Sequence, residues 1–304
     1  MDAVLLMAFG GPETLEEIPD FLRKLMRRTP PPHVEQDVIE RYRLLGGGSP
    51  LPETTRRQAQ ALEAVLARRG RPLRVYVGMQ YARPFIGDTF DTIVADGVTR
   101  LVALSLAPYR SRVSTQAYEE QVRQEAAQRG STLEIRFPGD WYDHPTYLDA
   151  LAERMEEALQ GLSPEERAET PVIFSAHSIP TRFVEQGDPY VEQLRAAAAG
   201  IHDRVGPFPW ELAFQSVGQA SREPWVGPEV EDVMDRFHDG GYRRVVVNPI
   251  GFVADHLETL YDNDVLHKEH AAKLGLEFIR VPCPNLQPKF IEALADLVEA
   301  SLGE

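Results

Sequence analysis

Hydrophobic residues occur along the chain in short, nearly continuous runs that alternate with longer stretches of helical periodicity. The short runs predict strands at Val4–Ala8, Val75–Gly78, Leu101–Leu106, Leu133–Phe137, Val172–Ser175, Leu212–Gln215, Val245–Asn248 and Glu277–Val281. The longer stretches predict helices at Leu15–Met26, Pro52–Ala67, Phe85–Ala95, Thr115–Arg129, Pro145–Leu159, Pro189–Ile201, Pro228–His238, Leu257–Leu274 and Pro288–Ser301. Continuous apolar runs are typical of parallel strands covered on both faces. Strand–helix alternation therefore predicts an α/β fold with parallel sheets.

The predicted strands form two sets of four with similar spacing. Two neighbouring strands of the first set begin 26 residues apart, and two of the second set begin 33 residues apart, so each interval holds one strand–helix unit. We expect two similar α/β halves, residues 1–140 and 141–304, with the last helix as a candidate to pack back on the first half. The first half carries extra chain at Arg27–Pro50, rich in Pro and Gly. An insertion of this kind often lines a site.

Composition narrows the class of protein. The chain has 304 residues, with 32 Lys and Arg against 47 Asp and Glu, for a net charge of −15. This balance argues against a nucleic-acid partner, which normally meets a basic surface, and suits a protein that gathers cations. The single cysteine, Cys283, cannot form an intramolecular disulfide or hold a cluster that needs about four thiolates. We expect a reducing, cytoplasmic environment.

The sequence also lacks the patterns of export and membrane anchoring. The apolar run Ala3–Phe9 has no basic region before it and ends at Gly10, which is not the pattern of a signal peptide. No apolar stretch approaches the ~18 residues of a membrane span. We therefore expect no stable membrane anchoring.

Candidate chemistry gathers where strands are predicted to end, and ligands of open α/β sheets bind beyond the carboxyl ends of the strands. His177 follows one strand and is placed to face a cleft between the halves, although a hydrogen-bonded structural histidine fits the same position. Glu258 and Asp262 are four residues apart, hence on one helix face. They form either a carboxylate track for a cation or protons, or a solvated helix face. We expect His267 and His270 on the surface.

Six segments, in order along the chain, carry a resemblance to a known family. They are Met7–Thr14, Arg41–Pro50, Ser175–Pro180, Gly187–Tyr190, Trp225–Pro228 and Gly251–Asp262. In these segments and their spacing the chain resembles the ferrochelatases, lyases that insert ferrous iron into a porphyrin in haem synthesis. The resemblance implies two Rossmann-like halves around a porphyrin cleft, each with a four-stranded parallel sheet flanked by helices. The insertion 27–50 would line the porphyrin.

The resemblance also implies roles for named residues. His177 and Glu258 correspond to the catalytic pair that forms the iron site, and Asp262 continues the acidic row as a possible relay. The positions that contact the porphyrin in the coproporphyrin-using branch are Phe9, Arg27, Arg41, Tyr42, Ser49 and Tyr118. Ferrous iron is then a substrate. No resident cofactor or iron–sulfur cluster is expected, and the expected state is a monomer.

Three departures from the family pattern are present: Phe9, Leu266, which ends the acidic row early, and the missing lip and tail. The first and the third bear on the substrate. Phe9 stands where many coproporphyrin-type enzymes have a tyrosine that ligates the product iron, and Leu266 stands where the helix often has a further glutamate. The compact chain, without the hydrophobic lip and cysteine-bearing tail of animal enzymes, favours coproporphyrin III and Fe-coproporphyrin III as product. The alternatives are protoporphyrin IX giving protohaem, a cobalt or nickel tetrapyrrole chelatase, and a haem carrier. A carrier needs no proton acceptor that faces a carboxylate, so His177 with Glu258 argues against it.

Overall fold

The computed structural model describes residues 1–217 and 223–303. Contacts divide the chain into two compact units. Unit 1 comprises Met1–Pro108, Val113–Asp140 and the chain from Leu286 onward, and unit 2 comprises Tyr109–Arg112 and Trp141–Asn285. The chain from Leu286, which holds the last helix, belongs to unit 1 by these contacts.

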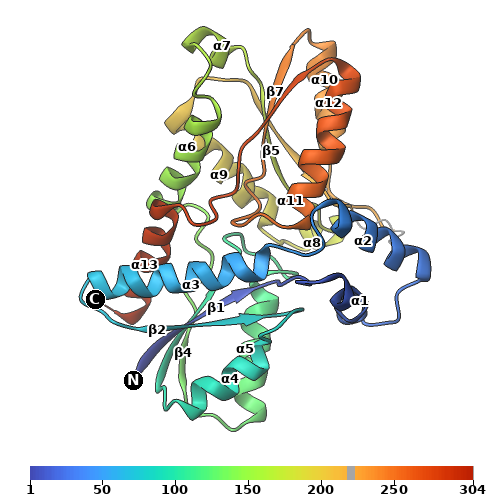
Figure 1. Cartoon of the computed structure of the whole chain (residues 1–304). Helices are drawn as coiled ribbons and strands as arrows, with labels where there is room; N and C mark the ends of the chain where they lie inside the picture. Colours follow the sequence, from blue (N-terminus) through green and yellow to red (C-terminus); the bar gives the residue numbers. More distant parts are fainter. Residues whose placement is uncertain (218–222, 304) are drawn as a thin grey trace. The chain divides into compact units, whose positions relative to one another are not determined.

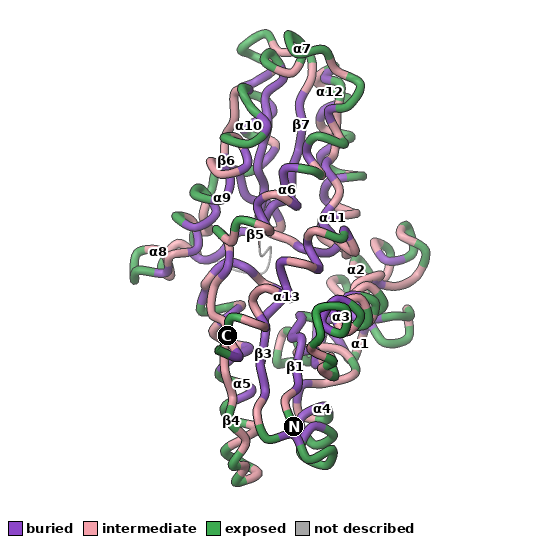
Figure 2. Tube along the Cα trace, turned by 90° about the vertical axis from the view of Figure 1, so that its left-hand side faces the viewer, coloured by how far each residue is buried: buried purple, intermediate pink, exposed green. Residues whose placement is uncertain are grey.

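Unit 1 contains a four-stranded parallel sheet in the order β2-β1-β3-β4. Its strands are β1 (Asp2–Ala8), β2 (Arg74–Met79), β3 (Arg100–Ser105) and β4 (Glu134–Arg136). Its helices are η1 (Leu15–Glu17), α1 (Ile18–Met26), α2 (Pro32–Leu44), α3 (Leu51–Arg68), α4 (Ile86–Ala95), α5 (Thr115–Gln128) and α13 (Pro288–Leu302) (Figure 1). The central strand β1 is fully buried from Ala3 to Met7 (Figure 2). Burial on both faces explains its unbroken apolar sequence.

Unit 2 repeats this topology with a sheet in the order β6-β5-β7-β8, again parallel. Its strands are β5 (Val172–His177), β6 (Trp210–Gln215), β7 (Arg244–Asn248) and β8 (Glu277–Arg280). Its helices are α6 (Pro145–Ala158), α7 (Pro164–Ala168), α8 (Thr181–Glu185), α9 (Tyr190–Val205), α10 (Val230–Asp239), α11 (Leu257–Tyr261), the π-helix η2 (Asp262–His267) and α12 (Lys268–Leu274). The same strand order in both sheets confirms the predicted pair of similar α/β halves.

The structure differs from the predicted helices at several places. The short helices α7 and α8 were not predicted, and two further differences lie at the insertion and after Leu257. The insertion Arg27–Pro50 contains the 13-residue helix α2, which begins at a proline, as a first helical turn tolerates. Only Tyr42 of α2 is buried, so the segment has little of the periodicity that reveals a helix. The helix predicted over Leu257–Leu274 is interrupted by η2, and π turns of this kind occur frequently at functional sites. None of the described helices is long and apolar enough to cross a membrane.

Ion pairs attach α13 to α3 within unit 1. The Arg69 guanidinium, just past the end of α3, lies 2.8 Å from Asp296 Oδ1 and 2.8 Å from Glu299 Oε2, and it also contacts Glu292. The three carboxylates stand on one face of α13, and the Arg69 side chain is 28% exposed. A network of this kind contributes more than an isolated surface pair. It helps to explain why the last helix packs in unit 1.

We expect Arg69→Ala to lower the free energy of unfolding by about 1 kcal/mol, because three neighbouring carboxylates would then repel one another. Urea titration followed by circular dichroism measures the change. Arg23→Ala is the matched control, since it breaks only the exposed pair with Asp20 and should change stability by less than about 0.5 kcal/mol. Equal losses in the two variants would contradict the role given to Arg69.

Candidate active site

His177 is the last residue of β5, where it stands at the carboxyl end of the unit 2 sheet. The hydroxyl of Tyr190 donates to the His177 carbonyl oxygen at 3.1 Å, which fixes the backbone. The imidazole Nδ1 faces the Ser178 carbonyl oxygen, so Nδ1 carries a proton and donates it. Nε2 is therefore the ring nitrogen available for chemistry, on a side chain that is 34% exposed.

Glu258 lies in the first turn of α11 and meets this imidazole. His177 Nε2 is 3.4 Å from Glu258 Oε1, and His256 Nε2 is 3.4 Å from Glu258 Oε2. The carboxylate is thus placed between two imidazoles that come from different parts of the chain. The structure brings together the two residues that the sequence identified as a catalytic pair, and adds His256 as a third member.

Burial and the neighbouring charges shift the pKa values of His177 and Glu258 in opposite directions. Burial disfavours the imidazolium, but the charge and hydrogen bond of the Glu258 carboxylate raise the pKa of His177 to about 9. Burial likewise disfavours the carboxylate, but the two neighbouring histidines hold the pKa of Glu258 well below its usual range. At neutral pH the pair is therefore an imidazolium and a carboxylate that hold one transferable proton.

The segment after β6 connects the strand ends to the helix. Ser175 Oγ donates to Gln215 Oε1 at 2.9 Å, and Gln215 Nε2 donates to the Glu258 carbonyl oxygen at 2.8 Å. The hydroxyl of Ser216 donates to Asp262. Ser216 has a left-handed backbone, with φ of 59°, a conformation that costs energy in a non-glycine residue and clusters at functional sites. These contacts fix the position of α11 relative to the end of β5.

Asp262 does not stand on an exposed acidic face. Its side chain is buried, 7% exposed, and it accepts from Ser216. The Gln215 amide nitrogen is 3.4 Å from Asp262 Oδ2. A carboxylate so placed orders the segment behind Glu258, and its role as a relay stays a prediction.

Gly251 allows the loop after β7 to lie against β5. Its amide donates to the Ser175 carbonyl oxygen at 3.1 Å. A Cβ at this position would come within 2.6 Å of the Ala176 Cβ, closer than atoms pack. Only glycine permits this approach directly beside His177.

The residues assigned to the porphyrin lie in unit 1, most of them near the carboxyl end of β1. Phe9 is 36% exposed, and its ring centroid lies 4.7 Å from that of Tyr81 and 6.3 Å from that of Phe21. Arg27 is exposed and has a left-handed backbone. Burial raises the pKa of Tyr81, and the charge of Arg27 opposes that shift.

Tyr42 and Ser49 pack against the loop that follows β1. A Cβ on Gly11 would meet Ser49 Oγ at 2.7 Å, and the Ser49 amide donates to the Pro12 carbonyl oxygen at 2.7 Å. Both side chains are buried. Arg41 is half-buried.

Tyr118 lies deeper than the other residues assigned to the porphyrin. It is 4% exposed within the hydrophobic core of unit 1. Its contact with a porphyrin therefore stays a prediction.

Sequence reasoning missed three residues of the candidate site. Tyr81 lies beside the residues assigned to the porphyrin, and Gln215 and Ser216 lie beside Glu258 and Asp262. Tyr81 follows β2, which pairs in parallel with β1, so the strand pairing itself was the signal that would have placed it beside Phe9. Gln215 is opposite His177 in the β5–β6 register. Its partner on the neighbouring strand was the signal in that case.

The prediction that His267 lies on the surface is wrong. Its ring is 2% exposed, and Nδ1 lies 3.1 Å from Asn263 Oδ1 within η2. Burial, with a smaller contribution from His270, lowers the pKa of His267 to about 4. The π turn directs this side chain inward. His270 is half-buried and pairs with Asp235 at 2.8 Å.

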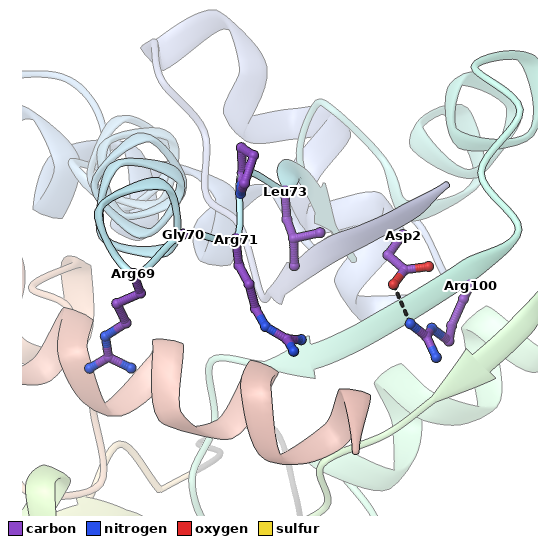
Figure 3. A pocket seen from close by; sticks show the side chains of 7 residues that line it. Asp2, Arg69, Gly70, Arg71, Leu73 and Arg100 are labelled. Atoms are coloured by element: carbon purple, nitrogen blue, oxygen red, sulfur yellow. Dashed lines mark hydrogen bonds and ion pairs between the residues drawn. The ribbon is translucent and has the colours of Figure 1, made fainter. Parts of the chain in front are cut away.

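A pocket of about 510 Å³ opens elsewhere in unit 1 (Figure 3). It is lined by Asp2, Arg69, Gly70, Arg71, Pro72, Leu73 and Arg100. Asp2 and Arg100 begin their strands, so the pocket stands at the amino ends of the sheet. It contains none of the predicted site residues, and Arg69 and Arg100 are already paired with carboxylates. Within residues 1–217 and 223–303, no group of three or more His, Cys, Asp and Glu side chains is arranged to hold a metal ion.

Comparisons with known proteins agree on one family. A family model described as ferrochelatase matches residues 1–302. The ferrochelatase of Deinococcus radiodurans is 37% identical over 99% of this chain and 96% of its own length. The coproporphyrin III ferrochelatase of Bacillus subtilis is 38% identical over 99% of this chain and 97% of its own.

Solved structures of two chelatases share the fold. SirB from Bacillus subtilis with Fe3+ has a TM-score of 0.62 at 14% identity, over 99% of this chain and 96% of that one. CbiX, a terminal enzyme of sirohaem biosynthesis in denitrifying bacteria, has a TM-score of 0.56 at 15% identity, over 99% of this chain and all of that one. At these identities the likeness establishes the two-unit α/β architecture and nothing finer.

Replacing Glu258 by Gln should lower the pKa of His177 from about 9 toward its ordinary value of 6.5, because the charge that opposes burial is lost. A titration of the His177 ring signals by NMR measures this. Asp262→Asn is the matched control: it removes a more weakly acting carboxylate and should change the pKa of His177 much less. A His177 that still titrates near 9 without Glu258 would show that another group holds the proton.

Proposed function

The chain belongs to the ferrochelatase family, the metal-inserting lyases, and from that premise we propose that it inserts ferrous iron into a porphyrin, with coproporphyrin III as the substrate. The observation that carries the proposal is the approach of His177 Nε2 to Glu258 Oε1 at 3.4 Å, at the carboxyl end of a parallel sheet. One imidazole and one carboxylate at this distance can exchange a proton for a metal ion.

The reaction exchanges cations. Two pyrrole N–H protons leave the macrocycle and one Fe²⁺ takes their place, so the porphyrin's own charge is unchanged. Ferrous iron is a borderline cation, and imidazole and carboxylate both suit it. Binding of a metal to such ligands displaces protons from them. We infer that iron first displaces the proton shared by His177 and Glu258 to solvent. As iron moves to the macrocycle, the freed pair receives the two pyrrole protons in turn, passes one to solvent and keeps the other, so that each cycle releases two protons and restores the resting pair.

The tautomer of His177 fits this role. Its Nδ1 is committed to the Ser178 carbonyl oxygen, so a single nitrogen, Nε2, alternates between proton and metal. A histidine that accepts and releases a proton is an effective general base when its pKa is near the working pH. Glu258 raises the basicity of the imidazole, and the arriving cation opposes that effect.

Recognition of coproporphyrin III depends on its four propionates. Arg27 and Arg41 offer planar guanidinium groups that match carboxylates, and the first is exposed and the second half-buried. Ser49 and Tyr118 are more buried, so we assign the larger share of propionate binding to the two arginines. The names of relatives such as the coproporphyrin III ferrochelatase of Bacillus subtilis support this choice.

We also propose that the protein works as a cytoplasmic monomer with no resident iron–sulfur cluster. Its one cysteine, Cys283, is buried. Burial raises the pKa of that thiol well above its ordinary value. A thiol kept protonated in this way is a poor ligand for a cluster.

Anaerobic metallation with ferrous iron, followed by the porphyrin absorbance bands, tests the function. We expect His177→Ala to lower kcat by about 100-fold or more, the range of a lost general base, while quenching of porphyrin fluorescence shows unchanged binding. His270→Ala, which alters a half-buried histidine of α12 paired with Asp235 of α10, should retain full activity. An active His177→Ala enzyme would overturn the assignment.

The same assay with two porphyrins tests the substrate. We expect a higher kcat/KM for coproporphyrin III than for protoporphyrin IX, and Arg41→Ala should reduce that preference about tenfold, because a charge-assisted hydrogen bond contributes roughly 1.5–3 kcal/mol. Arg43→Ala removes an exposed arginine of the same helix that pairs with Glu40, and should leave the preference intact. Faster metallation of protoporphyrin IX by the unaltered protein would refute the substrate but not the chelatase activity.

A further inference from the structure

Arg280 forms ion pairs with residues before and after Glu258 in the sequence. Arg280, the last residue of β8, places Nη1 2.8 Å from Asp255 Oδ1 and Nε 2.8 Å from Asp264 Oδ1. Asp255 comes three residues before Glu258, and Asp264 lies within the π-helix six residues after it. The guanidinium therefore joins the chain that leads into α11 to the turn that follows it.

The ion pair between Arg280 and Asp255 is largely shielded from solvent, and the pair with Asp264 is more exposed. The side chains of Arg280 and Asp255 are 17% and 18% exposed, whereas Asp264 is 41% exposed. A guanidinium presents its donors in a rigid planar fork, so two carboxylates bound to one fork are held at a fixed separation. An ammonium group on a flexible stem cannot impose that geometry.

Asn285 completes the hold on Asp255. Its side-chain carbonyl accepts from the Asp255 amide at 2.9 Å, and its amide nitrogen donates to Asp255 Oδ2 at 2.7 Å. The backbone N–H of Asn285 also donates to the Val253 carbonyl oxygen at 2.9 Å. Both carboxylate oxygens of Asp255 are thus occupied within the protein, and its position is specified from two directions. Asp255 serves as an anchor rather than as a metal ligand.

The anchored chain sets the surroundings of Glu258 directly. His256 follows Asp255, and its Nδ1 lies 3.1 Å from the Ala254 carbonyl oxygen. That contact aims His256 Nε2 at Glu258 Oε2. A shift of the 254–256 backbone would therefore move both the carboxylate and one of its two imidazoles. After Glu258 the chain forms the π-helix η2, a rare conformation in proteins. The ion pair of Asp264 with Arg280 ties this turn to β8.

We propose that Arg280 is a positioning residue for metal insertion: by joining Asp255 to Asp264 it fixes the Glu258 carboxylate against His177. The inference rests on the proposed iron insertion. It assigns to Arg280 an effect on the handling of the metal ion and none on the binding of the porphyrin.

Unit 2 offers a matched control in Arg244. This residue begins β7, the strand next to β8, and its Nε pairs with Glu277 at 2.8 Å. Its side chain is 22% exposed, close to the 17% of Arg280. It stands at the amino end of the sheet, so Arg244→Met removes a similar ion pair without touching the Glu258 segment.

The test measures KM for ferrous iron, KM for coproporphyrin III and kcat under anaerobic conditions. Arg280→Met should raise the iron KM at least tenfold and leave the porphyrin KM within twofold. Arg280→Lys should recover part of the loss, because an ammonium can reach one carboxylate but not both, and Asp264→Asn should give an intermediate iron KM. Arg244→Met should change neither constant. An unchanged iron KM in Arg280→Met, or an equal rise in both constants, would overturn the proposal.

A second readout does not depend on turnover. Cobalt(II) titrated into the full chain without porphyrin, followed by its visible bands, should bind at least tenfold more weakly to Arg280→Met than to the unaltered protein or to Arg244→Met. Equal cobalt affinity would contradict the role of Arg280. Failure of the unaltered protein to metallate any porphyrin would instead count against the proposed function. Should Arg280→Met not fold, Arg280→Lys and Asp264→Asn carry both measurements.

Discussion

Two groups whose charged forms burial disfavours stay charged in unit 2 because they are held within reach of each other. The imidazole of His177 and the carboxylate of Glu258 come from the end of β5 and the start of α11, 81 positions apart by their residue numbers. Desolvation acts against the charge on each group, and the charge of each favours the charge on the other. The surrounding polar structure therefore has one task, which is to keep a strand end and a helix start at a fixed separation. Gln215 does this from β6, Gly251 from the loop after β7, and Arg280 from β8.

The two units use the same sheet topology for different chemistry. Each sheet has its first strand in an inner position and presents residues beyond the carboxyl ends of its strands. In unit 1 these residues are aromatic or cationic, as with Phe9, Tyr81 and Arg27. In unit 2 they are titratable, as with His177 and Glu258. A planar apolar macrocycle with acidic substituents matches the first kind, and a divalent cation that exchanges with protons matches the second.

The strands could be predicted from the sequence because their signal is local, whereas the π turn after α11 could not. The sequence predicted all eight strands that the described residues form, because buried parallel strands need unbroken apolar runs. The helix after Leu257 was predicted as continuous, because a π turn depends on tertiary anchors such as Asp264 with Arg280, which periodicity does not contain. The same turn buries His267, expected on the surface. The pairing of His177 with Glu258 came from the family resemblance, since the residues alone left both a structural and a functional interpretation open. Tyr81, which no motif marked, needed the strand pairing.

The position of one proton explains why the supporting structure must be stiff. In the proposed exchange, the proton shared by His177 and Glu258 gives the pair a net charge of zero before iron arrives. A divalent cation that replaces it raises the charge, and the nearby carboxylates would then be drawn toward the metal. A carboxylate that followed the cation would bind it too tightly for release to the macrocycle. Because Ser216 holds Asp262 and Arg280 holds Asp255, Glu258 is the carboxylate left facing the imidazole. Weak, geometrically restricted binding is what a transferring site requires, since the ion must be passed on rather than kept.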